Sequence, residues 1–125
     1  SQPDGVTDGF YTFAQFDTPS KENCNEWVCN WIDKYEDIYG NSPNIGSAYG
    51  YMYADITAKA IEIAGSELNV DSFTSALESI DTYKMPFGES VLSWGPDKHL
   101  GSSDAYLFVV EDGRFVRADS MKYEY

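Results

Sequence analysis

The stretch from Ala48 to Gly65, AYGYMYADITAKAIEIAG, constrains the fold most, because it has the residue pattern of one continuous α-helix. Its apolar residues recur at helical spacing on two faces, Met52, Ile56, Ala60 and Ile63 on the first and Ala54, Ala58 and Ile61 on the second. Only a narrow third stripe is polar, with Asp55, Lys59 and Glu62. A helix of this kind is covered from two directions, so the sequence predicts a layered domain built around it.

Both ends of this helix carry further information. Three tyrosines, Tyr49, Tyr51 and Tyr53, follow its first residue, and Gly65 suits the left-handed position just past a helix end. Backbone N–H groups at a helix N-terminus point outward and favour anions. The tyrosines are therefore predicted to lie at the N-terminal mouth of the helix, either beside a ligand or as ordinary packing residues.

Charge and length exclude several classes of protein. The 125 residues fit one small domain or a piece of a larger one, and 42% of them are apolar, which is enough for a core. The net charge of −13 repels nucleic acid and anionic membrane surfaces. No apolar run approaches the roughly 18 residues of a membrane-spanning helix, and Ser1–Thr7 is too polar for the core of a secretory signal. Because a mature exported protein has also lost its signal, this does not argue for the cytoplasm.

Cys24 and Cys29 leave two interpretations open. If both lay within one helix, they would point roughly 140° apart and could hardly form a bridge. If Cys24 precedes the helix, a disulfide can form; the default expectation is two buried free thiols. Metal binding is not expected, because the single histidine, His99, is far away in the sequence and no C-x-x-C pair is present.

The remaining elements follow from periodicity and turn residues. A strand is predicted for Gly9–Phe16, a helix for Asn23–Tyr39, a helix for Ser72–Ile80 with Asp71 as its N-cap, a strand for Ser90–Trp94 and a loop for Pro96–Asp104. Tyr106–Val110 and Phe115–Ala118 flank Asp112-Gly113, the preferred pair for a type I′ hairpin turn. Three helices with so few strands cannot complete a doubly wound sheet. We therefore expect an α/β fragment, or a chain that completes its core by association.

Five phrases occur in a fixed order along the chain. They are Trp31-Ile32-Asp33-Lys34-Tyr35 with Tyr39-Gly40-Asn41-Ser42-Pro43, then Ala48-Tyr49-Gly50-Tyr51 with Ala60-Ile61-Glu62-Ile63-Ala64-Gly65, then Ala76-Leu77-Glu78, Asp97-Lys98-His99, and Tyr106–Val116 with Asp112-Gly113. In this order and spacing they resemble the C-terminal third of the type I periplasmic solute-binding proteins of ABC importers, the branched-chain amino acid (Leu/Ile/Val-binding) family. The resemblance covers nearly the whole chain from about Asp8 onward.

The resemblance implies a partial doubly wound three-layer lobe with a C-terminal β-hairpin. Proteins of this family have two α/β lobes with a ligand cleft between them, and the chain crosses between the lobes three times. By this resemblance, residues 1–17 are a strand and crossing from the second lobe, residues 18–100 are helices and a strand of the first lobe, and residues 101–125 are the terminal hairpin of the second lobe. The first two-thirds of such a protein are absent from this sequence.

The resemblance also suggests three ligand-binding residues. Tyr51 matches the tyrosine that begins the long helix near the cleft wall, and its ring would cover a bound amino acid or small carboxylate; Tyr49 is a weaker candidate. Asp17, with Thr18 at the proposed crossing, would contact an ammonium group or lie at the hinge, the alternative being a plain loop carboxylate. No catalytic residue, metal or cofactor is expected. His99 has no neighbouring nucleophile in a recognisable motif and is read as structural.

The expected function is that of an extracytoplasmic solute-binding component of an ABC transporter, periplasmic or extracellular. It would capture a small amino acid or related carboxylate between two lobes, deliver it to a membrane permease, and perform no chemistry. The isolated chain is expected to form a homodimer. The alternative is a ligand-sensing regulatory or self-associating interaction module of the same fold. A hydrolytic enzyme and a carbohydrate-binding module are disfavoured, the latter because such modules are usually all-β.

Overall fold

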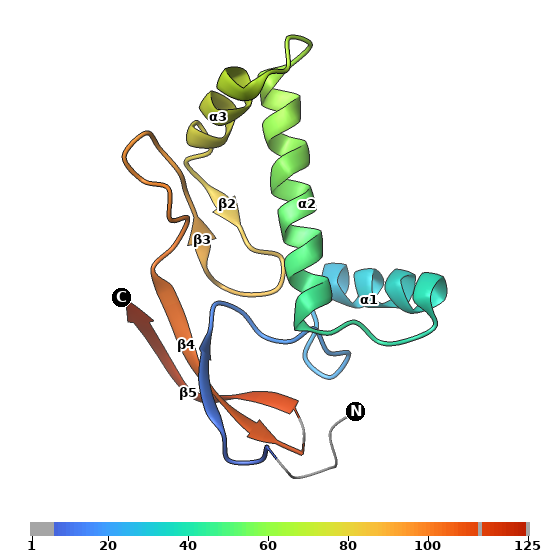
Figure 1. Ribbon diagram of the computed structural model, residues 1–125. Coiled ribbons are helices and arrows are strands. Elements are labelled where there is room, and N and C mark those ends of the chain that lie inside the picture. The colour runs from blue at the N-terminus through green and yellow to red at the C-terminus, as the bar shows by residue number, and fades with distance from the viewer. Residues whose placement is uncertain (1–6, 113, 125) are drawn as a thin grey trace.

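The computed structural model describes residues 7–112 and 114–124, which form two packed parts (Figure 1). In chain order the elements are β1 (Tyr11–Ala14), α1 (Glu26–Tyr39), α2 (Ile45–Ala64), α3 (Val70–Glu78), β2 (Tyr83–Lys84), β3 (Val91–Leu92), β4 (Asp104–Glu111) and β5 (Arg114–Glu124). One part is a three-stranded sheet in the order β1-β4-β5, and the other holds the helices and the β2–β3 hairpin. The α/β class, with a partial lobe and a C-terminal hairpin, is confirmed.

Helix α2 starts earlier than predicted. Asn44 caps it by accepting a hydrogen bond from the Ser47 backbone N–H at 3.1 Å, and Ser47 returns a side-chain contact to the Asn44 N–H, which completes a capping box. The predicted position of the tyrosines at the helix mouth is therefore wrong, because Tyr49 and Tyr51 lie on the body of α2. The predicted end is confirmed, since Gly65 caps the helix with φ 74°.

Only one of the two predicted apolar faces of α2 is covered within the described residues. The buried residues of this helix are Ala48, Met52, Ile56 and Ala60. Ala54, Ala58 and Ile61, predicted to form a second covered face, are exposed, and so is Ile63 near the helix end. Figure 1 shows the reason: α3 and the β2–β3 hairpin lie on the same side of α2.

Helix α1 shows how the cysteines pair. Asn25 caps this helix through the Val28 N–H at 2.9 Å, so Cys24 lies just outside it. Cys24 and Cys29 form a disulfide with their Cα atoms 5.4 Å apart. The default expectation of free thiols is wrong, and the alternative holds because the late start of α1 frees Cys24 from helical geometry.

Helix α3 begins with a second capping box. Asn69 accepts from the Ser72 N–H at 3.0 Å, and the Ser72 hydroxyl accepts from the Asn69 N–H at 2.9 Å. The predicted N-cap, Asp71, instead lies in the first turn. There its carboxylate is still favourable, because it faces the positive end of the helix dipole.

The β2–β3 hairpin contains a strand that the sequence prediction missed. The predicted strand Ser90–Trp94 is reduced to Val91–Leu92, and its partner is Tyr83–Lys84. Tyr83, Met85 and Phe87 are all buried, which is the period-2 pattern of a half-buried strand.

The three-stranded sheet is antiparallel throughout. β1 pairs with β4 in the register Tyr11↔Val109 to Ala14↔Tyr106, and β4 pairs with β5 down to Glu111↔Arg114. The predicted hairpin is confirmed and is longer than expected. Asp112 has the positive φ of 50° that a type I′ turn requires, while Gly113 lies outside the described residues, so the turn type stays a prediction.

Phe16 joins the two parts. Its side chain is 1% exposed and its ring centroid lies 4.5 Å from that of Tyr49 and 6.2 Å from that of Phe87. A Cβ added to Gly88 would come within 2.7 Å of the Phe16 Cβ. The hairpin turn therefore rests directly on the segment that leaves the sheet, and glycine is what permits this approach.

We expect Gly88→Ala to lower the free energy of unfolding by about 1–3 kcal/mol, because the new methyl group overpacks the contact with Phe16. Gly50→Ala is the matched control: nothing lies within 4 Å of its added Cβ, and alanine favours the helix by up to about 1 kcal/mol. Urea unfolding followed by circular dichroism measures both. Equal effects of the two substitutions would contradict the close contact at Gly88.

Candidate functional site

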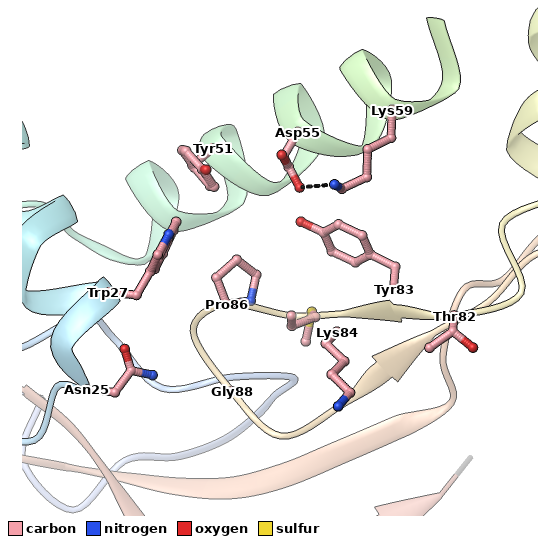
Figure 2. Close-up of a pocket in the computed structure, with 11 residues that line it drawn as sticks. Asn25, Trp27, Tyr51, Asp55, Lys59, Thr82, Tyr83, Lys84, Pro86 and Gly88 are labelled. Atoms are coloured by element: carbon pink, nitrogen blue, oxygen red, sulfur yellow. Dashed lines mark ion pairs between the residues drawn. The ribbon is translucent and has the colours of Figure 1, made fainter. Parts of the chain in front are cut away.

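A pocket opens between α2 and the β2–β3 hairpin, and we call it the aromatic pocket (Figure 2). Its volume is about 630 Å³. It is lined by Asn25, Trp27, Tyr51, Asp55, Lys59, Thr82, Tyr83, Lys84, Met85, Pro86 and Gly88. Its walls thus come from α1, α2 and the hairpin, three elements that are separate in sequence.

Packed rings form one end of the aromatic pocket. The ring of Trp27, on α1, meets Tyr51, on α2, edge to face at 5.4 Å, and both contact Phe87 from the hairpin. Trp31 packs behind them, 4.7 Å from Phe87. Edge-to-face contacts of this kind hold each ring in a defined orientation. Tyr51 is therefore held in a defined orientation by its neighbours.

The polar groups of the pocket lie one and two turns further along α2. Asp55 and Lys59 form an i, i+4 ion pair with 3.8 Å between the carboxylate oxygen and Nζ. Their side chains are 31% and 49% exposed, so this pair contributes little to stability. Figure 2 shows the Asp55 carboxylate directed toward the space between Tyr51 and Tyr83.

Tyr83 brings a buried hydroxyl to the same space. The residue is 4% exposed, and its hydroxyl has no hydrogen-bond partner among the described residues. Desolvation by burial, and then the neighbouring Asp55 carboxylate, raise the pKa of Tyr83, so the phenol stays neutral. A buried unsatisfied polar group costs about 1–3 kcal/mol, which makes this hydroxyl an unusual feature of the fold.

A second hollow, which we call the junction groove, lies where the chain leaves the sheet for the helices. It has a volume of about 1120 Å³ and includes Asp17, Thr18, Ile32, Phe87 and Arg117 in its lining. Asp17 accepts two hydrogen bonds from the Arg117 guanidinium, at 2.9 and 3.0 Å. The guanidinium also lies 3.9 Å from the centre of the Tyr106 ring. This bidentate, stacked arrangement ties the segment that follows β1 to β5.

The three residues predicted to bind ligand do not share one site. Tyr51 lines the aromatic pocket, whereas Asp17 lines the junction groove. Tyr49 lines neither of these hollows; it contacts the rings of Phe16 and Tyr53. Residues two apart on a helix point roughly 200° apart, which explains why Tyr49 and Tyr51 separate.

Sequence reasoning missed Trp27, Asp55 and Tyr83 as members of a site. Asp55 lies four residues after Tyr51 and therefore on the same face of α2, so the spacing was available in the sequence. Trp27 and Tyr83 reach the pocket only through the packing of α1 and the hairpin against α2. Local periodicity does not encode these long-range contacts.

His99 has a 78% exposed side chain with its Nε2 3.6 Å from a Glu78 carboxylate oxygen, on the loop after β3. Within residues 7–112 and 114–124, no group of three His, Cys, Asp or Glu side chains is placed to hold a metal ion. Over the same residues, no helix has the length and apolar character needed to cross a bilayer.

Comparison with known proteins places this geometry in context. A family model described as "Periplasmic binding protein" matches residues 2–114. A branched chain amino acid ABC transporter from Thermus thermophilus with bound valine is similar in structure, with a TM-score of 0.74 and 16% identity over 95% of this chain and 34% of that one. A solute binding protein of an ABC transporter from Rhodopseudomonas palustris BisB5, in complex with 3,4-dihydroxy benzoic acid, is also similar in structure. Its TM-score is 0.69 and its sequence identity is 18%, over 96% of this chain and 32% of that one.

A third structure, the leucine-, isoleucine-, valine-, threonine-, and alanine-binding protein from Brucella ovis, in a closed conformation, gives a TM-score of 0.63 at 15% identity over 96% of this chain and 32% of that one. The chain thus spans about a third of the length of these structures. At sequence identities this low, the structural similarity shows a shared fold only. No significant match is found among curated protein sequences.

We expect Tyr83→Phe to raise the free energy of unfolding by about 1 kcal/mol, because it removes an unsatisfied buried hydroxyl and keeps the ring. The matched control is Tyr35→Phe. The Tyr35 hydroxyl accepts a hydrogen bond from the Ser47 hydroxyl at 3.0 Å, so its removal should lower the free energy of unfolding by roughly 0.5–1.5 kcal/mol. For both variants, the change in the free energy of unfolding is measured from the midpoint of urea unfolding. Destabilisation by Tyr83→Phe would show that the hydroxyl has a partner after all.

Proposed function

This chain belongs to the periplasmic binding protein family, and from that premise we propose that it forms the C-terminal part of the solute-binding component of an ABC importer. The component captures a small amino acid or related carboxylate between two lobes. The observation that carries this proposal is the family match over residues 2–114, because it covers almost the whole chain.

The similar solved structures support a small carboxylate as the ligand class. Valine and 3,4-dihydroxy benzoic acid, each bound to one of them, share a carboxylate and differ in the rest of the molecule. Clefts between lobes accept such variation because a few polar groups fix orientation while the apolar lining is free to differ. On this chain, Tyr51 is the proposed contact, with its ring covering the ligand from the first lobe.

The two packed parts suggest how the lobes divide. We assign residues 18–100 to the first lobe, and residues 1–17 and 101–125 to the second. The junction groove then lies at the boundary between them, and the Asp17–Arg117 pair ties the crossing segment to the second lobe. We therefore propose Asp17 as a hinge residue more than as an ammonium contact. Tyr49 packs on Phe16, and we propose that it supports the hinge.

The cellular setting follows from the same proposal. A solute-binding component delivers its ligand to a membrane permease from the periplasm or the cell exterior, and it performs no chemistry. The Cys24–Cys29 disulfide supports an exported protein, because such bonds persist in oxidising compartments and are rare in the cytosol.

A second candidate function rests on the exposed face of α2. Tyr53 and Ile61 on this face are 60% and 42% exposed, beside the exposed Ala54 and Ala58. Apolar helix faces of this kind are found where another surface docks. A sensing or self-associating module of the same fold would use this face to bind a partner or a second copy.

Ligand capture is tested on the full-length gene product with a panel of amino acids and aromatic acids, using calorimetry. We expect Tyr51→Ala to weaken binding of the preferred ligand about tenfold or more, through loss of the ring that covers it. Tyr53→Ala, on the same helix but outside the aromatic pocket, is the control and should bind normally. No binding to any panel member would rule out this ligand class.

Self-association is tested on the 125-residue chain by native mass spectrometry. We expect a dimer, because burying the exposed apolar face of α2 releases water from it, while repulsion between surface charges is screened over about 8 Å at physiological salt. Ile61→Lys should shift the equilibrium to monomer. A monomeric wild-type chain at micromolar concentration would refute the expectation.

A further inference from the structure

We propose that the Cys24–Cys29 disulfide is a reducible latch that holds Trp27 in the wall of the aromatic pocket. The bridge closes a short loop that contains Asn25 and Trp27, and both of these residues line the pocket. The inference rests on the proposed function, because it concerns the regulation of the site that contains Tyr51. It gives the two cysteines a part in the shape of that site.

The loop closed by the disulfide is the first turn of α1. Cys24 precedes the helix and Cys29 lies about one turn inside it, with the N-cap Asn25 between them. The Asn25 side chain accepts a hydrogen bond from the Val28 N–H at 2.9 Å, and its backbone carbonyl accepts one from the Cys29 N–H at 2.9 Å. Helix ends are where the hydrogen-bond ladder is incomplete and frays. The bridge therefore ties down the turn of α1 that opens most easily.

The position of Trp27 depends on this turn more than on burial. Trp27 is 44% exposed, whereas its neighbour Val28 is 7% exposed and belongs to the core. The Trp27 ring meets Tyr51 at 5.4 Å and Phe87 at 5.8 Å, both edge to face. Each such pair contributes little by itself, so the ring keeps its place only while the backbone of the turn is fixed. Opening the turn removes Trp27 from the pocket wall, and α1 beyond Val28 stays packed.

The ionic contacts on the same segment are too weak to replace the disulfide. Lys21 forms ion pairs with Asp33 and Glu36 on α1, each at 2.7 Å. The Lys21 side chain is 50% exposed and that of Asp33 is 61% exposed, so salt screens the pair and it contributes little. The bond between Cys24 and Cys29 is covalent and insensitive to salt. The position of the turn therefore depends on the disulfide.

The bridge lies where a dithiol can reduce it. Both cysteines are partly exposed, and both lie at the N-terminal end of α1, where the positive end of the helix dipole stabilises a thiolate. A stabilised thiolate is a good leaving group, which favours reduction. The dithiol supplies two electrons and two protons: its first thiolate forms a mixed disulfide with one cysteine, and its second thiol then displaces that cysteine. The dithiol ends as its own disulfide, and Cys24 and Cys29 end as two thiols.

The first test follows amide hydrogen exchange by NMR in the 125-residue chain, with dithiothreitol as the reductant. We expect reduction to speed exchange of the Val28 and Cys29 N–H groups about tenfold or more, because both donate hydrogen bonds to Asn25 and the loop that held Asn25 is open. Unchanged exchange at these two groups would overturn the proposal.

The start of α3 is the internal control, since it has the same cap without a disulfide. The Ser72 and Phe73 N–H groups donate to Asn69 at 3.0 and 2.9 Å, as the corresponding groups of α1 donate to its own cap residue. Dithiothreitol should leave their exchange unchanged. Equal acceleration at both helix starts would show a general loss of stability and would count against a local latch.

The indole N–H resonances follow the pocket wall itself, with that of Trp27 assigned through Trp27→Phe. We expect reduction to move the Trp27 resonance toward the position of an exposed indole, and reoxidation to restore it. Trp94, which lies against Gly101 and does not line the aromatic pocket, should keep its resonance. If both indoles lose their folded positions together, the bridge holds the whole fold and the latch is refuted.

Variants separate the bridge from other effects of the reductant. The double variant Cys24→Ser, Cys29→Ser should show the loosened Trp27 resonance without reductant and should not respond to dithiothreitol. Asn69→Ala, which removes the cap of α3, is the matched control and should leave Trp27 in place. A response of the double variant to dithiothreitol, or equal loosening of Trp27 by Asn69→Ala, would contradict the latch.

The latch and solute capture fail in different ways, because the test of the latch needs no ligand. If the full-length product binds a member of the panel and Trp27 is unaffected by reduction, the latch is refuted and solute capture stands. If Trp27 loosens on reduction while the panel gives no binding, the ligand class is refuted and the latch stands.

Discussion

The packing of Phe16 holds the molecule together as one body. This ring closes against Tyr49 on α2 and against Phe87 in the hairpin, at the point where the chain leaves the sheet. Because Gly88 has no side chain, the hairpin turn comes close enough to seal the contact. The positions of α2 and of the hairpin, and hence both hollows, depend on this junction. Next to this apolar contact, the Asp17–Arg117 pair adds directional hydrogen bonds.

Helix α2 has a different environment on each of its sides. One side supplies the core through Met52 and Ile56, a second carries the polar groups of the aromatic pocket, and a third is exposed. The pocket side tolerates an unpaired hydroxyl at Tyr83, which a core selected for stability alone would replace with phenylalanine. Such departures from local consistency are expected where a protein uses a residue for binding.

Local patterns in the sequence were sufficient for the body of α2, its end at Gly65 and the terminal hairpin, since each depends on neighbouring residues. The helix starts were misplaced because Asn-x-x-Ser at 44–47 and 69–72 was not recognised as a capping pattern. The β2 strand was missed although Tyr83, Met85 and Phe87 alternate inward. The aromatic pocket could not be predicted from the sequence, because Trp27 and Tyr83 come to line the same pocket as Tyr51 only when the chain folds.

The order of strands in the sheet has a consequence for chain length. β1 and β4 pair side by side, with Tyr11 opposite Val109 and Ala14 opposite Tyr106, although all the helices and the β2–β3 hairpin lie between them in sequence. The whole helical part is thus a loop inserted between two paired strands. The entropy cost of closing such a loop rises by only about 0.6 kcal/mol for each doubling of its length. Insertions or deletions among the helices therefore leave the sheet almost unaffected, provided that the two ends of the insert still meet at Phe16.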